Sequence, residues 1–188
     1  MDLKEQLTDE ELASKVQAGD TESFGFLVER YEPKLKRYGT KFISNRAYIE
    51  DLVQDIFIKV YTNIQSFNTK MRFSPWIYRI AHNEFVNAIK KRVRTPLSFF
   101  DLDEVFPHLT SNETADGEAA ESETKRMMDD CLDKLDSKYR EPLILYYYED
   151  MDYQEIAEIM HIPISTVGVR INRGKKLLRK IFDDRFKK

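Results

Sequence analysis

The sequence has 188 residues, a formal net charge of −3 and 34% charged residues, with only six Gly and six Pro. This composition favours helices over a loop-rich or all-β fold. The single cysteine, Cys131, cannot form an internal disulfide, and its apolar neighbours at helical spacing indicate packing rather than a redox or metal role. No apolar run reaches membrane-spanning length and no basic, apolar leader precedes the acidic N-terminus, so we expect a soluble cytoplasmic protein.

The first block of the chain, residues 8–94, is predicted to be helical throughout. Asp9 is placed to cap a helix that runs to Val16, and Thr21 to cap one that starts at Glu22. A third helix is expected over residues 46–64. Four of its apolar residues should point inward and four polar residues outward. These are Leu52, Val53, Ile56 and Val60 on one side, and Asp51, Gln54, Asp55 and Lys59 on the other. From periodicity alone, the polar side could be no more than a solvated face.

Residues 66–94 combine aromatic rings with positive charges. Four rings lie within twelve residues, among and ahead of basic side chains. They are Phe67, Phe73, Trp76 and Tyr78, with Lys70, Arg72, Arg79, Lys90, Lys91, Arg92 and Arg94. Bases of single-stranded nucleic acid stack on such rings while cations hold the backbone, each stack contributing about 1–3 kcal/mol. The alternative is that the rings are core residues, as we expect for Trp76 and Phe85, whereas the polar neighbours of Phe67 and Tyr78 favour exposure. Asn83 and Asn87, one helical turn apart, could present amides to base edges.

The character of the chain changes between Pro96 and Thr124, where eight acids occur and no Lys or Arg. Such a segment cannot bury enough apolar surface to offset its ordering entropy, so residues 95–124 are predicted to be a flexible acidic linker. The remaining residues, 125–188, are again predicted to be helical. One apolar stripe there is formed by Leu132, Leu135, Tyr139, Leu143 and Tyr147. The fold class is therefore all-α, with two helical domains joined by the linker.

Two short helices around a tight turn are predicted near the C-terminus. The first covers residues 153–160, Pro163 ends the pattern, and the second starts near Ile164 and buries Val167, Ile171 and Leu178. From Ser165 to the C-terminus there are nine Lys or Arg against two Asp. This is the layout of a DNA-binding helix-turn-helix with a cationic second helix. An amphipathic helical hairpin with an ordinary charged face is the alternative from spacing alone.

An enzyme is not expected. The three histidines, His82, His108 and His161, lie in different segments without metal-ligand spacing, and no phosphate-binding glycine loop or nucleophile elbow is present. We therefore predict no catalytic residue, no metal, no cofactor and no small-molecule substrate.

Three motifs together resemble one known family. They are EDLVQDIFIKVY (residues 50–61), FSPWIYRIAHN (73–83), and YREPLILYYYEDMDYQEIAEIM (139–160) with IPISTV and INRGKKLLRK following. In order and spacing, with an acidic linker between, they resemble the sigma-70 family of bacterial transcription initiation factors, in its small two-domain extracytoplasmic-function (ECF) group. The resemblance implies a protein that binds core RNA polymerase and directs it to specific promoters, melting the −10 element and contacting the −35 element.

The resemblance also assigns roles to particular residues. Asp51, Gln54, Asp55 and Phe57 fall at positions that contact core polymerase. Residues in or beside the −10 surface are Phe67, Trp76, Tyr78, Asn83, Asn87, Lys90 and Lys91. Residues on the −35 helix are Ser165, Thr166, Arg170, Arg173 and Lys176. The implied partners are the β′ clamp helices and β flap of core polymerase, promoter DNA, and an anti-sigma factor or other targeting partner, and the linker would thread the active-site and RNA-exit channel.

The chain departs from the family at two places. Gly168 and Val169 stand where a Lys and a small hydroxyl residue are usual, and His161 replaces the usual turn glycine at a position that a left-handed backbone would favour. By resemblance, the variable loop at residues 68–72 sets the −10 preference. The remaining rival function is a helix-turn-helix repressor that does not bind polymerase, which would explain the C-terminus but not the aromatic-basic segment.

Overall fold

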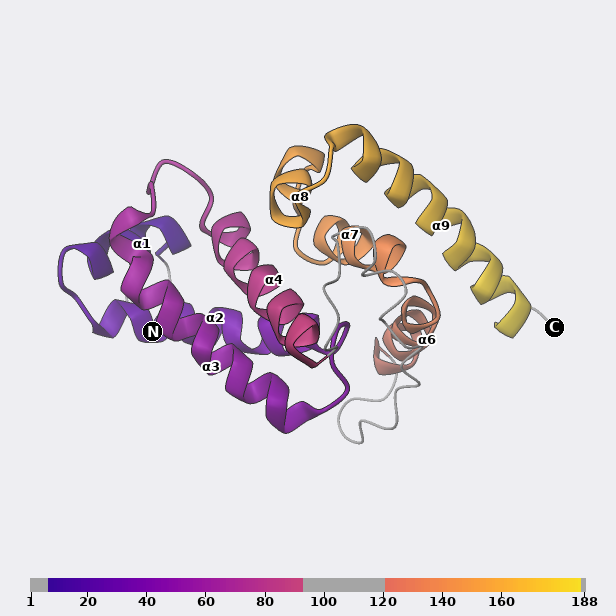
Figure 1. Cartoon of the computed structure of the whole chain (residues 1–188), viewed down its shortest axis with the longest axis horizontal. Helices are drawn as coiled ribbons and strands as arrows, with labels where there is room; N and C mark the ends of the chain where they lie inside the picture. The colour runs from indigo at the N-terminus through magenta and orange to yellow at the C-terminus, as the bar shows by residue number, and fades with distance from the viewer. Residues whose placement is uncertain (1–6, 93–120, 187–188) are drawn as a thin grey trace. The chain divides into compact units, whose positions relative to one another are not determined.

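The computed structural model describes residues 7–92 and 121–186, and the regular elements in these ranges are all helices. The helices form two compact units, the first built from the N-terminal helices up to Arg92 and the second from most of the C-terminal residues (Figure 1). The predicted all-α, two-unit fold is confirmed. The expected linker, residues 95–124, lies largely outside the described residues, and its last four positions are already helical.

Within residues 7–92, the first unit contains four α-helices and a short 3₁₀ helix. They are α1 (Asp9–Gln17), α2 (Glu22–Gly39), α3 (Arg46–Asn63), η2 (Ile64–Ser66) and α4 (Phe73–Arg92). Helix α1 packs on α2 and α4, and α3 packs on the same two helices. Apolar side chains at helical spacing, among them Leu27, Leu35, Ile56 and Ile77, are completely buried between them. The predicted helix over residues 46–64 ends at Asn63, where η2 continues the chain.

The start of α1 differs in detail from the prediction. Thr8, not Asp9, caps the helix: its side chain accepts a hydrogen bond from the Glu11 amide while Glu11 Oε2 accepts one from the Thr8 amide at 2.8 Å. This reciprocal pair is a capping box. Asp9 is thereby free to bind α2, with Oδ1 2.7 Å from Arg30 Nη1 and Oδ2 2.6 Å from the Tyr31 hydroxyl.

The second helix begins at Glu22 as predicted, but its capping chemistry also differs. The Thr21 side chain makes no capping hydrogen bond. Instead, the Asp20 carboxylate accepts hydrogen bonds from both the amide and the hydroxyl of Ser23, at 3.3 and 2.9 Å. At the other end, Gly39 allows close packing, because a Cβ there would lie 2.7 Å from the Phe85 ring. The packing of this core therefore requires a residue without a side chain at position 39.

The C-terminal part of the chain forms α6 (Glu121–Asp133), α7 (Ser137–Tyr147), α8 (Tyr153–Met160) and α9 (Ile164–Phe186), which belong to the second unit except for the last three residues of α8. The apolar stripe predicted over residues 132–147 is divided between two helices, which are separated by residues 134–136. Buried Arg140 joins these helices, with Nη1 3.4 Å from Asp133 Oδ1, and burial lowers the pKa of its guanidinium. Cys131 is completely buried, as predicted, and burial raises the pKa of its thiol.

Candidate polymerase and nucleic-acid interfaces

The outward side of α3 is polar, as the sequence predicts. Asn45 caps this helix, accepting a hydrogen bond from the Tyr48 amide at 3.1 Å. Asp51, Gln54 and Asp55 are exposed, while Leu52, Val53, Ile56 and Val60 are buried beneath them. Because neither Asp51 nor Asp55 takes part in the core, both carboxylates are available to a partner's cations.

Phe57 does not belong to this exposed side. Its side chain is 8% exposed and packs edge-on against Phe24 of α2, with ring centroids 6.3 Å apart. Phe57 is thus buried in the free protein, and its assignment to a core-polymerase contact stays a prediction. Helix α3 does expose the neighbouring aliphatic residue, Ile58, at 61%. Ile58 lies seven residues after Asp51 and three after Asp55, so a helical wheel places all three on one side.

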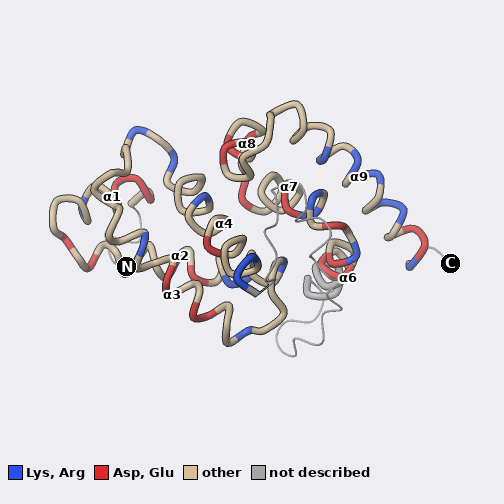
Figure 2. Tube along the Cα trace, viewed as in Figure 1, with Lys and Arg blue, Asp and Glu red and all other residues tan. Residues whose placement is uncertain are grey.

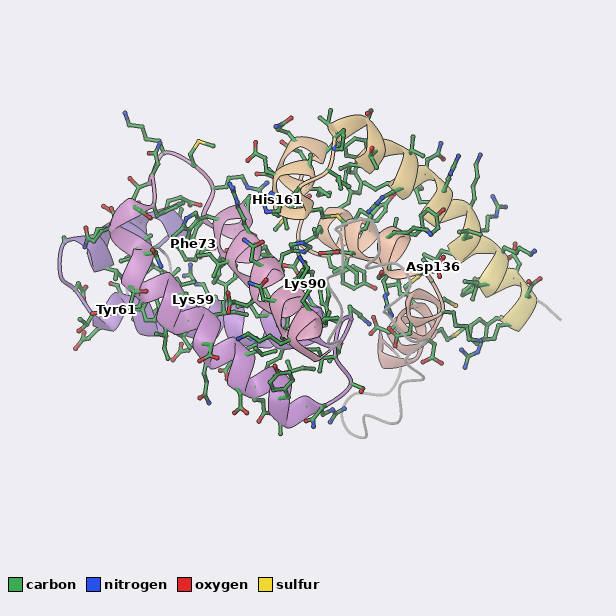
Figure 3. The ribbon with its side chains drawn as sticks, in the orientation of Figure 1. Lys59, Tyr61, Phe73, Lys90, Asp136 and His161 are labelled. Carbon is green, nitrogen blue, oxygen red and sulfur yellow. The ribbon has the colours of Figure 1, made fainter. Side chains whose placement is uncertain are left out.

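We call Asp51, Gln54, Asp55 and Ile58 the α3 stripe. It continues toward Tyr61, which is 45% exposed and contacts Phe24 at a centroid distance of 5.0 Å. Figure 3 shows Tyr61 at the outer edge of the first unit. Lys59, which follows Ile58 in the sequence and is also exposed, forms an ion pair with Glu84 that joins α3 to α4. The stripe thus combines two negative charges with an exposed aliphatic side chain on a rigid helix.

The aromatic residues after α3 form a closed cluster. Phe67 lies 5.3 Å from Phe73 and 5.1 Å from Trp76, and Phe73 also contacts Tyr31 at 5.4 Å. Phe67 is 5% exposed and Phe73 is fully buried (Figure 3), whereas Trp76 is half-buried. The expectation of an exposed Phe67 is wrong, because its ring closes the base of the following loop. We call Phe67, Phe73 and Trp76 the neck.

Tyr78 is also buried, contrary to the prediction from its polar neighbours. Its ring is 0% exposed and lies edge-on to Tyr38, 5.2 Å away. The polar candidates on α4 are more accessible. Asn83 and Lys90 are half-buried, while Asn87 and Lys91 are exposed. The structure therefore leaves amides and ammonium groups, together with one side of Trp76, as the accessible part of the predicted −10 surface.

The loop at residues 68–72 rises from the neck and exposes several side chains. Met71 is 62% exposed, and Lys70 and Arg72 on either side of it are exposed too. A turn closes the loop, since the Met71 amide donates to the Asn68 carbonyl at 2.9 Å and the Lys70 amide donates to Asn68 Oδ1 at 3.1 Å. The Met71 side chain can contact a nucleic-acid base, while Lys70 and Arg72 on either side of it can contact the phosphates next to that base.

The predicted helix-turn-helix is present in the second unit. Helix α8 has the predicted limits and α9 starts at the predicted Ile164, and the turn between them contains His161 at a φ of +54°. A left-handed residue at this position was expected from the family's usual glycine, so the histidine carries a backbone conformation that glycine adopts without cost. Val167 and Ile171 are buried, which fixes the rotation of α9 about its axis. The prediction that Leu178 is buried with them is wrong: it is half-buried, because it lines an open apolar cavity between α6, α7 and α9.

Helix α9 carries many Lys and Arg residues along its length (Figure 2), and all of these in the described part of the helix are exposed or half-buried. Exposed or half-buried along one side of the first half of α9 are the predicted Ser165, Thr166, Arg170, Arg173 and Lys176, together with Val169 and Asn172. Sequence reasoning missed these last two, although Val169 lies opposite the buried Val167 and Ile171 on a helical wheel and Asn172 lies at the border of the same exposed side. We call this set the α9 face. Its cations suit phosphates, while Val169 and Asn172 offer an apolar group and an amide that can meet a thymine methyl or an adenine edge.

Two glycines in α9 have different surroundings. A Cβ on Gly168 would lie 3.4 Å from the Tyr153 ring, an ordinary contact. A Cβ on Gly174 would lie 2.9 Å from Leu143 Cδ1 and 3.2 Å from the Tyr139 carbonyl oxygen. Gly174 is thus required where α9 crosses α7, whereas Gly168 is not required by packing.

An apolar cavity of about 520 Å³ lies between α6, α7 and α9. Leu132, Leu143 and Phe182 contribute to its lining, and Lys175 and Arg179 bring two cations to it. The Lys175 ammonium lies 5.7 Å from the centre of the Tyr147 ring, and a hydrogen bond to that tyrosine raises its pKa. The cavity can accept the apolar side of a partner helix.

Within residues 7–92 and 121–186, no three His, Cys, Asp or Glu side chains gather as ligands for a metal ion. In the same part of the chain, no helix is long and apolar enough to cross a membrane.

Comparison with known families identifies both units. The model for Sigma-70 region 2 matches residues 27–95, and the model for Sigma-70, region 4 matches residues 125–178. The first match contains the α3 stripe, the neck and α4, and the second contains the helix-turn-helix. These two regions define the class of the protein as a sigma-70 type transcription initiation factor.

Individual relatives narrow the class. The chain is 36% identical to the ECF RNA polymerase sigma-E factor of Haemophilus influenzae over 94% of its length and 96% of the relative's. It is 33% identical to the ECF RNA polymerase sigma factor SigW of Bacillus subtilis, over 90% and 94% of the two chains. The chain therefore belongs to the ECF sigma factors.

Solved structures agree on the fold. The sigma factor RpoE of Bartonella quintana, in complex with the anti-sigma factor NepR, matches with a TM-score of 0.68 at 24% identity, over 87% of this chain and 98% of that one. CnrH in complex with the cytosolic domain of CnrY matches with a TM-score of 0.64 at 23% identity, over 94% and 98%.

Proposed function

We propose that this ECF sigma factor binds core RNA polymerase through its first unit and directs it to specific promoters, where the first unit melts and holds the −10 element and the second contacts the −35 element. The observation that carries the proposal is the presence of two different exposed surfaces in the two matched regions. One is acidic and aliphatic, and the other is cationic. The catalytic chemistry would be the polymerase's, in the cytoplasm, and the chain itself needs to supply only binding and positioning.

The α3 stripe is the proposed site for the β′ clamp helices. Asp51 and Asp55 offer charge to Arg or Lys of the partner, Gln54 offers an amide, and Ile58 supplies apolar area at the same place. Interfaces gain most from a buried apolar anchor surrounded by polar contacts. Phe57 supports this stripe from beneath through its contact with Phe24.

For the −10 element, the exposed loop and the accessible polar residues of α4 are the proposed contacts. Lys70, Met71 and Arg72 lie on the loop, while Asn83, Asn87, Lys90 and Lys91 lie along α4. Phe67 and Tyr78 are buried, so we assign them a supporting role. Trp76, half-buried at the neck, is the ring best placed for a flipped base to stack on.

For the −35 element, the α9 face is the proposed reader, with Arg170, Arg173 and Lys176 on phosphates or base edges. The apolar cavity between α6, α7 and α9 is the proposed seat for the β flap. We assign the domains as residues 8–94 and 125–188, with 95–124 linking them through the polymerase channel. Because the matched sigma factor RpoE is in complex with the anti-sigma factor NepR, we also propose that an anti-sigma partner restrains this chain.

The proposal is tested by reconstitution. The purified chain is mixed with bacterial core polymerase, the complex is isolated by size-exclusion chromatography, and transcripts made from genomic DNA are mapped at their 5′ ends. We expect a stoichiometric complex and a set of start sites that share −10 and −35 sequences. A repressor, the rival function, would bind duplex DNA without core polymerase and would programme no start sites.

A further inference from the structure

Helix α1 is hydrogen-bonded to one end of the loop at residues 68–72. The Gln17 side-chain amide donates to two main-chain carbonyls, that of Ile64 at 2.7 Å and that of Phe67 at 2.8 Å. The Gln65 side chain returns a hydrogen bond to the Gln17 carbonyl at 3.0 Å. The backbone that leads into the loop is therefore held by one side chain of a distant helix.

The same helix holds the other end of the loop. Glu10 Oε1 accepts a hydrogen bond from the amide of Phe73 at 2.8 Å. Phe73 is the first residue of α4, and the first amides of a helix have no partner within that helix. Glu10 thus acts as a helix cap from 63 positions away in sequence.

Helix α1 sets the separation of these two ends. Glu10 and Gln17 are seven residues apart, which is about two turns or roughly 10 Å along one side of a helix. Helix α1 is itself anchored to α2, through Asp9 with Arg30 and Tyr31. Between the two ends, the neck packs ring on ring and the loop exposes Met71 with its neighbouring cations.

We propose that Gln17 and Glu10 are positioning residues for −10 recognition: by fixing both ends of the 68–72 loop, they hold it in the shape that captures unpaired promoter DNA. This inference rests on the proposed function. A loop whose ends are already fixed loses less conformational freedom on binding, so more of the contact energy appears as affinity and selectivity. Helix α1 lies before residue 27, where the match to region 2 begins, so the matched segment does not include it.

The test uses the full chain bound to core polymerase and a pool of single-stranded DNA randomised at six adjacent positions. Bound sequences are read out, and the affinity for the preferred sequence is measured. Gln17→Glu keeps the size of the side chain but turns a carboxylate toward two carbonyls, and Glu10→Ala removes the cap on α4. Glu10→Gln retains an acceptor oxygen and is the matched rescue variant, while Lys15→Ala, exposed on the same helix, is the control.

For Gln17→Glu and Glu10→Ala, we expect the affinity for the preferred sequence to fall about tenfold, the effect of losing one or two net hydrogen bonds. Base preference should flatten at the positions the loop contacts, and affinity for core polymerase should stay unchanged. Glu10→Gln and Lys15→Ala should keep the wild-type preference.

Unchanged base preference in both loss variants would overturn the positioning role alone. So would an equal loss for every sequence accompanied by a lower melting temperature, because that pattern describes general loosening of the unit. A wild-type holoenzyme that selects no sequence at all would instead overturn the proposed function, so the two failures are distinguishable.

Discussion

The two units present themselves to nucleic acid in different ways. In the first, most rings are buried, and the exposed groups are a short loop with fixed ends and a few amides and ammonium groups on α4. In the second, one long helix exposes a row of cations and carries little acid. A pre-shaped loop with stacking and amide groups suits unpaired bases, whose contacts depend on geometry, whereas a cationic helix suits duplex phosphates. The difference shows that one chain can use one unit to bind unpaired bases and the other to bind duplex DNA.

The assignment of polymerase binding to the first unit is tested most severely by reversing both charges of the α3 stripe. Asp51→Lys with Asp55→Lys should weaken core binding about a thousandfold or more, since like charges placed across an interface cost several kcal/mol. Titration of labelled chain with core polymerase measures this, and circular dichroism checks the helix content. The matched control is reversal of Glu29, exposed on α2. Full assembly by the double variant would remove the assignment.

Phe57 and Ile58, which are neighbours on α3, allow a structural role to be distinguished from a direct contact with core polymerase. Phe57→Ala should lower the free energy of unfolding by about 3 kcal/mol, because it leaves a cavity beside Phe24. Ile58→Asp should leave stability unchanged, since its side chain is 61% exposed, but should reduce core affinity about tenfold or more through lost apolar burial. Urea unfolding and core titration measure the two effects. Destabilisation by Ile58→Asp, or normal binding by it, would contradict the division.

Replacing the two glycines of α9 should change stability by smaller amounts and in opposite directions. Gly174→Ala should cost about 1–3 kcal/mol of stability, because the new methyl group meets Leu143 and the Tyr139 carbonyl. Gly168→Ala should instead stabilise by about 0.5–1 kcal/mol, since a helical glycine gives way to a better helix former without a clash. Thermal unfolding measures both. If Gly168→Lys tightens binding to −35 duplexes, the missing lysine limits the second unit; equal binding would show that α9 already reads the duplex without it.

The smallest expected effect concerns salt. Arg173→Ala or Lys176→Ala should each reduce the slope of log affinity against log salt by about one on a −35 duplex, the signature of a lost phosphate contact. Asn83→Ala in the first unit should weaken open-complex formation without changing that slope. Promoter binding measured at several salt concentrations distinguishes them. Identical slopes for all three variants would mean that the two units do not differ in electrostatics.

Helix limits and buried residues were predicted most accurately from the sequence where a single apolar periodicity runs along the helix. The limits of α8, the start of α9 and four buried residues of α3 followed from spacing and turn chemistry, whereas the left-handed residue at His161 followed from the resemblance to the family. Exposure of aromatic rings could not be predicted in the same way. Tyr78 is buried by Tyr38 of another helix and Phe67 by the rings of the neck, and such tertiary contacts leave no local signal.

Other features were hidden for related reasons. The separation of α6 from α7 interrupts an apolar stripe that reads as continuous, since Leu132 and Leu143 are buried on both sides of the break. The hydrogen bonds of Gln17 and Glu10 join residues about fifty or more positions apart, and one sequence contains no record of such pairs. A complete helical wheel of α3 would have placed Ile58 on the exposed side with Asp51 and Asp55. Its residue type alone indicates the opposite, because isoleucine is usually a core residue.

Trp76 gives the molecule its own optical reporter. It is the only tryptophan in the chain, it is half-buried, and its ring lies 5.1 Å from Phe67 at the base of the loop. Indole emission depends on the polarity around the ring, so the intrinsic fluorescence of the unlabelled protein comes from the place where unpaired DNA is proposed to enter. Strand capture, displacement by a competing protein and disturbance of the neck can thus each be followed in real time, in solution, without attaching a dye.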